Sequence, residues 1–293
     1  MTMRMTLRRS RLAAELRRLH GDSGLSLDQV EERTDIKKST LSRIHKNATT
    51  NVPYVKTLAE AYGADERTRA CLIALVKGAR QRGGWWAAHA DSVTDDLLEF
   101  VSFEAIAATV YDWENAVLPG LLQTRAYAEA AIREVNEEEL TDDVVATRAE
   151  MRLRRQDRLA GDNPLSLYAI IDEPVLYRRT GGAEVMWEQL AHLTKLSKQP
   201  NVHLHVVSRT LGAHAGMLGS YQLLEFPDEE YMDPVVYMET IGGEMYLEGK
   251  EPLAKVRRLW DHLRGAALDK EASRQAIRQA AEKMTDDGHS HGR

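Results

Sequence analysis

A short run near the N-terminus carries side chains that could read a base sequence in duplex DNA. Lys38, Ser39, Ser42 and Arg43 lie within the stretch KKSTLSRIHK, at positions that share one face of a helix. Arg and Lys can donate to guanine O6 and N7, a hydroxyl can serve a base or a phosphate, and a helix fits the width of the major groove. The run therefore predicts a helix that reads DNA.

The apolar residues around this run indicate how the helix is held. Val30, Ile36, Leu41 and Ile44 can converge on one small core only if two short helices cross steeply, as in a helix-turn-helix. The alternative is an ordinary helical hairpin with a solvated charged face. We favour the helix-turn-helix because the turn, the core spacing and the neighbouring helices agree.

Caps define the ends of the first helix of this pair. Ser26 can accept hydrogen bonds from the amides of Leu27 to Gln29, so the helix should begin after it. It should end near Thr34, because Asp35 can adopt the left-handed conformation of a tight turn. We expect DNA contacts from the polar and basic residues of both helices: Ser26, Gln29, Lys37, Lys38, Ser39, Thr40, Ser42, Arg43 and Lys46.

Further helical patterns at residues 8–20, after Pro53 and after Asp65 complete an all-α unit of five helices. Over residues 8–78 the sequence resembles the Xre family of regulators, which implies a lambda-repressor-like DNA-binding fold. Two positions depart from that family. Lys37 stands where it often has a capping Ser or Thr, and Leu27 where it often has a phosphate-contacting Gln.

Charge separates the chain into two parts. Residues 1–82 contain 17 Lys or Arg against 9 Asp or Glu, whereas the remaining residues contain 22 against 36. A basic first part beside an acidic second part is expected if only the first faces phosphates. We therefore expect a DNA-binding domain at 1–82 and an effector and dimerisation domain at 83–284, followed by an unordered tail at 285–293.

The second domain shows a mixed pattern. Residues 83–160 read as mainly helical, and 165–284 as a mixed sheet with helices. Strand-like runs occupy 165–171, 202–207, 221–226, 235–240 and 244–247, and amphipathic helices occupy 184–196, 252–264 and 270–283. A helix between the first two strands predicts that they are parallel. The expected fold is α/β or α+β with a four- to five-stranded mixed sheet.

Composition excludes several classes of protein. The 293 residues contain one cysteine, Cys71, so no internal disulfide framework is possible. No apolar run approaches the roughly 18 residues of a membrane span, and the basic start has no apolar segment after it. We expect a cytoplasmic protein without a membrane partner.

Aromatic residues in the second domain suggest a pocket for a small-molecule effector. Acidic residues surround them, which favours a core or a ligand pocket over base stacking. The candidate ligand-binding residues are Trp85, Trp86, Tyr111, Trp113 and His214.

We expect no catalytic residues, no metal and no cofactor, and hence no enzyme. His203 and His205 project from one face of a strand and His214 follows, which could outline a metal site. A half-exposed strand explains the alternation better, because no Cys, HExxH or other metal or catalytic motif accompanies the histidines.

A second resemblance covers nearly all of residues 80–270. The stretches RQRGGWWAAHAD, FVSFEAIAATVYDWENAVLPGLLQTRAYAEAAI, PNVHLHVVS, GAHAGMLGSYQLLEFPD, PVVYMET and YLE resemble the uncharacterised effector domain, sometimes called antitoxin-like, of many actinomycete helix-turn-helix regulators. That resemblance implies transcriptional control and a small partner protein encoded nearby. It supplies no catalytic residues and no accepted ligand.

Two function classes follow. The first is a sequence-specific regulator that binds double-stranded DNA as a homodimer and senses a small ligand or a small partner protein. The second is an antitoxin-like interaction protein that sequesters a small cognate protein and autoregulates its operon. An enzyme carried by a DNA-binding module is a distant third.

Overall fold

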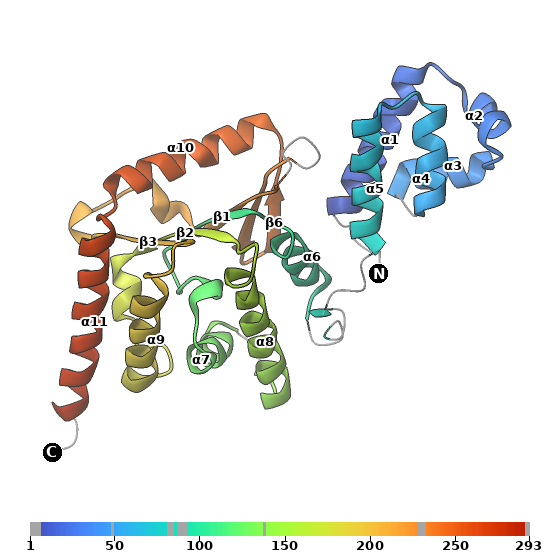
Figure 1. Cartoon of the computed structure of the whole chain (residues 1–293). Coiled ribbons are helices and arrows are strands. Elements are labelled where there is room, and N and C mark those ends of the chain that lie inside the picture. The colour runs from blue at the N-terminus through green and yellow to red at the C-terminus, as the bar shows by residue number, and fades with distance from the viewer. Residues whose placement is uncertain are drawn as a thin grey trace. The chain divides into compact units, whose positions relative to one another are not determined.

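The computed structural model describes residues 7–47, 50–80, 85–86, 89, 93–136, 139–227 and 233–290. The chain forms two compact units, one mainly of residues 1–88 and the other of residues 89–227 and 233–293 (Figure 1). The boundary expected at residue 82 lies outside the described residues, and it stays a prediction.

The N-terminal unit is the expected bundle of five helices. They are α1 (Leu7–Ser23), α2 (Leu27–Thr34), α3 (Lys38–Asn47), α4 (Val52–Ala61) and α5 (Glu66–Arg80). Val30, Ile36, Leu41 and Ile44 are at most 4% exposed and share one core with residues of the other three helices. The predicted helix-turn-helix core is confirmed.

Both predicted ends of α2 are also confirmed. Ser26 Oγ accepts from the amide of Gln29 at 3.3 Å, and Gln29 Oε1 accepts from the amide of Ser26 at 2.8 Å, which forms a capping box. At the other end, Asp35 adopts φ 58° and ψ 20°, the left-handed conformation. This residue lets the chain turn sharply into α3.

The second unit is built on a six-stranded sheet in the order β3-β2-β1-β4-β5-β6. The first three strands are parallel and the last three run antiparallel to their neighbours. Their bounds are β1 (Thr109–Glu114), β2 (Ser166–Asp172), β3 (Val202–Val207), β4 (Tyr221–Glu225), β5 (Val235–Thr240) and β6 (Gly243–Leu247). The α/β expectation is confirmed, but the expected number of strands was wrong because β1 was not recognised.

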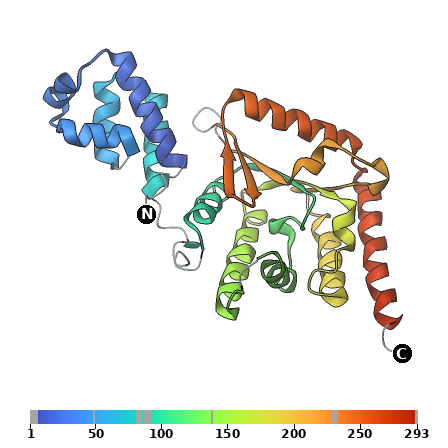
Figure 2. The ribbon, with the colours of Figure 1, turned by 180° about the vertical axis from the view of Figure 1, so that it is seen from behind.

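Helices cover both faces of this sheet, as seen from opposite sides in Figures 1 and 2. One face carries α10 (Lys250–Ala266). The other carries α6 (Asp95–Glu104), α7 (Arg125–Val135), α8 (Asp142–Arg155), α9 (Ala183–Leu196) and α11 (Lys270–Ser290). Short 3-10 turns lie at Gly120–Leu122, Gln156–Leu159, Glu173–Tyr177, Arg209–Leu211 and Ala215–Leu218.

Helix α11 extends to Ser290 and therefore occupies much of the tail that was expected to be unordered. Residues 291–293 lie outside the described residues. In the part of the chain that the structure describes, no helix is both long enough and apolar enough to cross a membrane.

Candidate functional site

The outer face of α3 carries the predicted DNA-reading side chains. Lys38, Ser39, Ser42 and Arg43 are all exposed, while Leu41 and Ile44 on the inner face are buried. Lys37 and Lys46 are exposed too, and Thr40 is half-buried. The helix thus presents short and basic groups to solvent along one face.

The start of α3 is capped by α2. Lys37 has no side-chain acceptor to offer, but Glu31 Oε2 accepts from the amide of Lys38 at 3.2 Å. The ammonium group of Lys38 in turn forms an ion pair with Asp28. The carboxylate of Glu31 therefore replaces the missing Ser or Thr as the cap, and the Asp28 ion pair adds a second contact between α2 and the N-terminus of the recognition helix.

These contacts already engage some of the predicted DNA-contacting side chains and leave others available. Ser26 Oγ and Gln29 Oε1 are engaged in the capping box, although both side chains are exposed. Lys38 is paired with Asp28. Among the described residues, no ion pair or side-chain hydrogen bond involves Arg43, so its guanidinium is available for a base.

The far end of α3 is held by a cluster that sequence reasoning missed. Arg17 on α1 donates to the carbonyl of His45, and His45 Nε2 lies 3.1 Å from the hydroxyl of Tyr62. The His20 ring packs 5.0 Å from the His45 ring. Burial lowers the pKa of His45 to about 4, and the nearby His20 and Arg17 add to this, so the ring is neutral at pH 7. His45 follows Leu41 by four residues, and that spacing was a signal that it faces inward.

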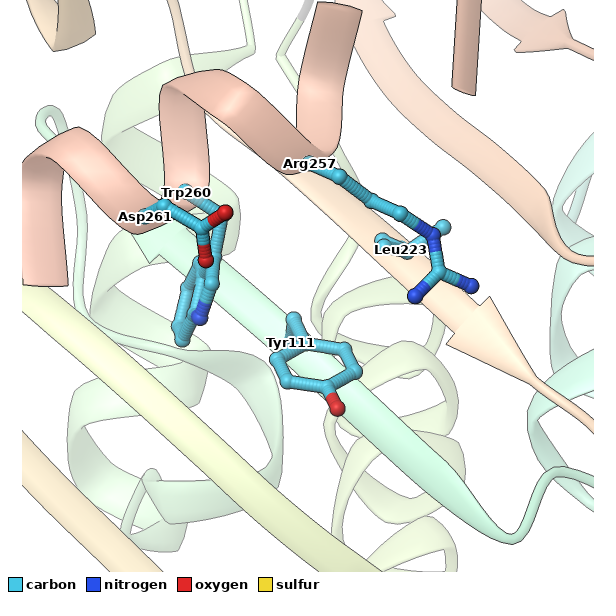
Figure 3. A pocket seen from close by; sticks show the side chains of 5 residues that line it. All are labelled: Tyr111, Leu223, Arg257, Trp260 and Asp261. Carbon is cyan, nitrogen blue, oxygen red and sulfur yellow. The ribbon is translucent and has the colours of Figure 1, made fainter. Parts of the chain in front are cut away.

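The second unit has a small pocket between the sheet and α10 (Figure 3). Its volume is about 170 Å³, and its walls are Tyr111, Leu223, Arg257, Trp260 and Asp261. Tyr111 meets Trp260 edge to face, with 5.1 Å between ring centroids. Burial raises the pKa of the Tyr111 hydroxyl, and the nearby Glu225 raises it further. The pocket combines two aromatic walls with one basic and one acidic rim residue.

An aromatic row crosses the parallel strands beside this pocket. Tyr111, Tyr168 and His203 are register partners on β1, β2 and β3. Tyr111 stacks on Tyr168 at 5.2 Å, and Tyr168 stacks on His203 at 4.3 Å. Lys270 Nζ lies 3.0 Å from His203 Nδ1 and ends the row.

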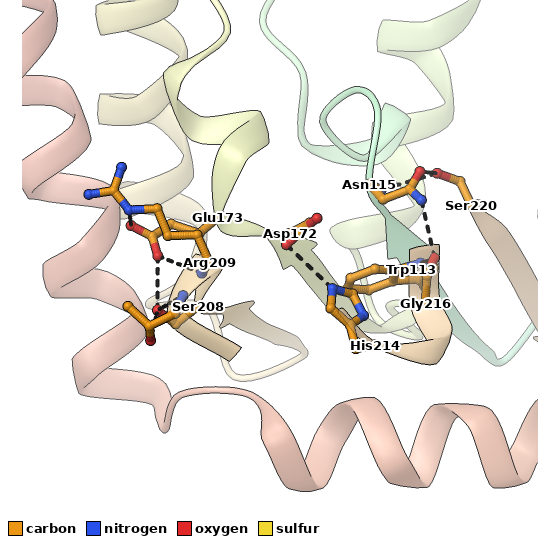
Figure 4. Close-up of polar contacts among 10 residues, drawn as sticks. Trp113, Asn115, Asp172, Glu173, Ser208, Arg209, His214, Gly216 and Ser220 are labelled. Atoms are coloured by element: carbon orange, nitrogen blue, oxygen red, sulfur yellow. Dashed lines mark hydrogen bonds and ion pairs between the residues drawn. The ribbon is translucent and has the colours of Figure 1, made fainter. Parts of the chain in front are cut away.

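A loop after β3, residues 208–220, folds back over the carboxyl ends of the parallel strands (Figure 4). Glu173 Oε2 accepts from the Ser208 hydroxyl at 3.0 Å and from the Arg209 amide at 2.9 Å. His214 Nε2 lies 3.8 Å from Asp172 Oδ1. Polar groups at the end of β2 therefore fix the first half of the loop.

The end of β1 fixes the second half of this loop. The Trp113 indole N–H donates to the carbonyl of Gly216 at 2.8 Å, and the Asn115 amide donates to the same oxygen at 3.1 Å. A Cβ on Gly216 would come within 2.6 Å of the Trp113 ring, so the close approach requires glycine. Ser220 closes the loop with a 3.0 Å hydrogen bond to Asn115 Oδ1.

Two family matches divide the chain in the same way. Residues 11–72 match a helix-turn-helix domain, and residues 97–279 match a domain of unknown function, DUF5753. The second match covers more than half of the 293 residues. The chain belongs to the DUF5753 family. No curated protein and no solved structure matches it. The helix-turn-helix match supports a DNA-binding regulator.

The five predicted ligand-binding residues are divided between the two units. Trp85 and Trp86 pack edge to face at 5.8 Å within the N-terminal unit. In the DUF5753 domain, Tyr111 lines the pocket, whereas Trp113 is fully buried and packs against His214 at 5.5 Å. Of the five, the structure assigns only Tyr111 to the pocket lining.

Sequence reasoning missed the α10 side of this pocket in the DUF5753 domain. Arg257, Trp260 and Asp261 share one side of a helix that was predicted, but nothing local indicated which strand it covers. The three histidines are also separate: His205 Nδ1 bonds the carbonyl of Leu268 at 2.9 Å, His203 lies in the aromatic row and His214 in the loop. Within the described residues, no group of three metal-binding side chains occurs.

Two acidic groups, the buried Asp112 and the half-buried Glu114, lie on the opposite face of the DUF5753 sheet. Gln222 donates to Asp112 Oδ2 at 3.0 Å, and burial raises the pKa of Asp112 well above its usual value. Burial also raises the pKa of Glu114 to about 7, although Ser220 and Arg152 oppose the shift. Arg155 forms a bidentate ion pair with Glu104 nearby, and both side chains are buried.

Proposed function

We propose that this protein is a sequence-specific transcriptional regulator whose N-terminal unit reads double-stranded DNA through α3. The observation that carries the proposal is the exposed face of Lys38, Ser39, Ser42 and Arg43 on a helix held at both ends. Ser26 and Gln29 at the start of α2, with Lys37, Thr40 and Lys46, would contact the phosphates that flank the reading site.

The regulator acts as a homodimer in this proposal. One recognition helix reads only a few base pairs, and a two-fold axis doubles the contacts and gives the selectivity that a genome demands. The DUF5753 domain would hold the dimer and receive a signal. We assign it no catalytic role and no cofactor.

The signal is a small molecule or a small protein. The pocket of about 170 Å³ under α10 is smaller than the cavities that hold drug-sized ligands, so it suits a compact ligand held against Tyr111 and Trp260. Arg257 and Asp261 at its rim would supply the polar contacts.

The second candidate is an antitoxin-like protein that sequesters a small cognate protein and controls its own operon. The rigid loop after β3 favours it, because it exposes Leu211, Met217 and Leu218 at 44%, 56% and 85%. Three exposed large apolar side chains on one loop are a feature that a protein partner could cover.

Selection of bound fragments from a random DNA pool tests the proposal. We expect an enriched palindrome with half-sites about one helical turn apart. The absence of enrichment for any sequence, at low and high salt, would refute the regulator. The second candidate predicts in addition that the product of a neighbouring gene co-purifies with the chain.

A further inference from the structure

The two edges of the DUF5753 sheet differ in how their backbone groups are bonded. At the β3 edge, the Val206 amide donates to Ser273 Oγ at 3.0 Å, and the Val206 carbonyl accepts from the Leu268 amide at 2.8 Å. The connection between α10 and α11 thus covers this edge. At the β6 edge, within the described residues, no backbone hydrogen bond to residues 244–247 comes from outside the β5–β6 pair.

The β6 edge carries few of the features that commonly prevent strand pairing, and its one acid, Glu244, accepts a hydrogen bond from the Thr94 hydroxyl at 3.2 Å. Its sequence, Gly-Glu-Met-Tyr-Leu, contains no Lys and no Pro. Met245 is 46% exposed in the middle of the strand, and Ile241 at the tip of the hairpin is fully exposed. Native sheets usually protect such an edge with charge, proline or a covering segment.

We infer that β6 pairs antiparallel with β6 of a second copy of this chain, so that one sheet runs through a dimer. The inference rests on the proposed regulator being a homodimer and names the surface that joins it. A two-fold axis perpendicular to the sheet turns an edge strand onto itself in the antiparallel sense, which is the pairing that closed symmetry requires.

The residues of β6 select one register for this pairing. In an antiparallel pair, directly opposed residues have their side chains on the same side of the sheet. The two-fold axis must therefore pass beside a residue and not between two residues, and the candidates in the strand are 244, 245 and 246. An axis at 244 sets Glu244 against itself, and an axis at 246 sets Glu244 against Glu248. Only an axis at Met245 places no acid directly opposite an acid, because Glu244 then faces Tyr246 of the other copy.

This register also joins apolar surfaces. Met245 is the register partner of Met238 on β5, and Met238 and Leu247 lie at the margin of the core under α10. Pairing at Met245 would bring the two Met245 side chains together and continue that apolar strip into the other copy. Met245 is the exposed member of this strip in the single chain, and the dimer would cover part of it.

The mass of the full chain in solution, measured without DNA by light scattering, tests the interface. We expect twice the 33.0 kDa of one chain. Met245→Lys places two like charges opposite each other and should weaken the dimer at least ten-fold, with an unchanged circular dichroism spectrum. Leu218→Lys adds the same charge at another exposed apolar site and should leave the mass doubled. A monomeric chain, or a dimer that Met245→Lys does not weaken, overturns the inference.

Disulfide formation tests the register. Directly opposed residues in an antiparallel pair have Cα atoms about 4.5 to 5.5 Å apart, within the range of a disulfide. In a Cys71→Ala background, Met245→Cys should give a covalent dimer under mild oxidation, while Glu244→Cys, diagonal across the axis, should give much less. Equal cross-linking of the two variants overturns the register.

These results are independent of DNA binding. A chain that is monomeric but still selects a DNA sequence refutes the β6 interface and keeps the regulator. A β6 dimer that selects no DNA sequence supports the interface and refutes the regulator.

Discussion

At the scale of single residues, Arg43 is the group on which base reading depends most. It is exposed, whereas the neighbouring Lys38 is paired with Asp28. Arg43→Ala should lower affinity for the selected operator by about 1 to 3 kcal/mol and relax the base preference at one position. Gel shifts on the operator and its single-base variants measure both effects.

Lys46→Ala is the matched control for Arg43→Ala, because Lys46 is an exposed cation about one turn further along the same helix. As a phosphate contact it should weaken binding to all sequences by a similar factor. If Arg43→Ala also weakened every sequence equally, Arg43 would not read a base.

Glu114 predicts a dependence of stability on pH. Burial raises its pKa to about 7, and the same cause raises that of Asp112. The folded state holds a proton at Glu114 more tightly than the unfolded state, whose pKa is about 4.3. The free energy of unfolding that this proton contributes is therefore complete below about pH 4.3 and is lost as pH rises through about 7. The melting temperature should therefore fall between about pH 5 and pH 7 and level off above that.

Scanning calorimetry of Glu114→Gln checks this prediction. The neutral amide should make the melting temperature less dependent on pH over that interval, while Glu188→Gln, at an exposed position on α9, should behave like the unaltered chain. An equally steep fall in Glu114→Gln would assign the pH dependence to another group.

At the scale of elements, α3 depends on α2 for its N-terminal cap. Glu31→Ala removes the acceptor of the Lys38 amide and should cost about 1 kcal/mol of unfolding free energy, as for the loss of an N-cap. It should also reduce operator affinity, because the first turn of the recognition helix loses a hydrogen bond that holds it in position. Glu32→Ala, exposed on the same helix, is the control. Chemical denaturation and gel shifts on the two variants measure both effects.

The sequence predicted α2 and α3 well because their determinants are local. Ser26, Gln29 and Asp35 specify the ends of α2 within a few residues of themselves. The cap of α3 could not be predicted, since the carboxylate that replaces a local Ser or Thr comes from Glu31, seven residues earlier on the other helix. Local rules thus located the site, and tertiary contacts supplied the groups that hold it.

Strand β1, in contrast, could not be predicted from its own residues. Asp112 and Glu114 interrupt its apolar pattern, and acidic residues are uncommon in a central strand. Asp112 is tolerated because Gln222 on β4 donates to it across the sheet, 110 residues later in the chain. The aromatic residues of the same strand were therefore assigned to a ligand site, although Trp113 is part of the core.

At the scale of the whole molecule, the charge division predicts how binding responds to salt. Lys and Arg exceed Asp and Glu in the first 82 residues and fall below them in the rest. Only the N-terminal unit should then contact phosphates, and each contact contributes about −0.9 to the slope of log affinity against log salt on duplex DNA. A dimer that seats both recognition helices makes two equal sets of contacts.

Met245→Lys, which should separate the copies, therefore predicts about half the salt slope of the unaltered chain on the same palindrome, when a single chain binds one half-site. Fluorescence anisotropy with labelled operator, titrated at several salt concentrations, measures both slopes. Leu218→Lys should retain the full slope, since it carries the same added charge without touching β6. If the variant were monomeric and still showed the full salt slope, phosphate contacts outside one half-site would carry the affinity. The proposed two-fold arrangement on DNA would then be wrong.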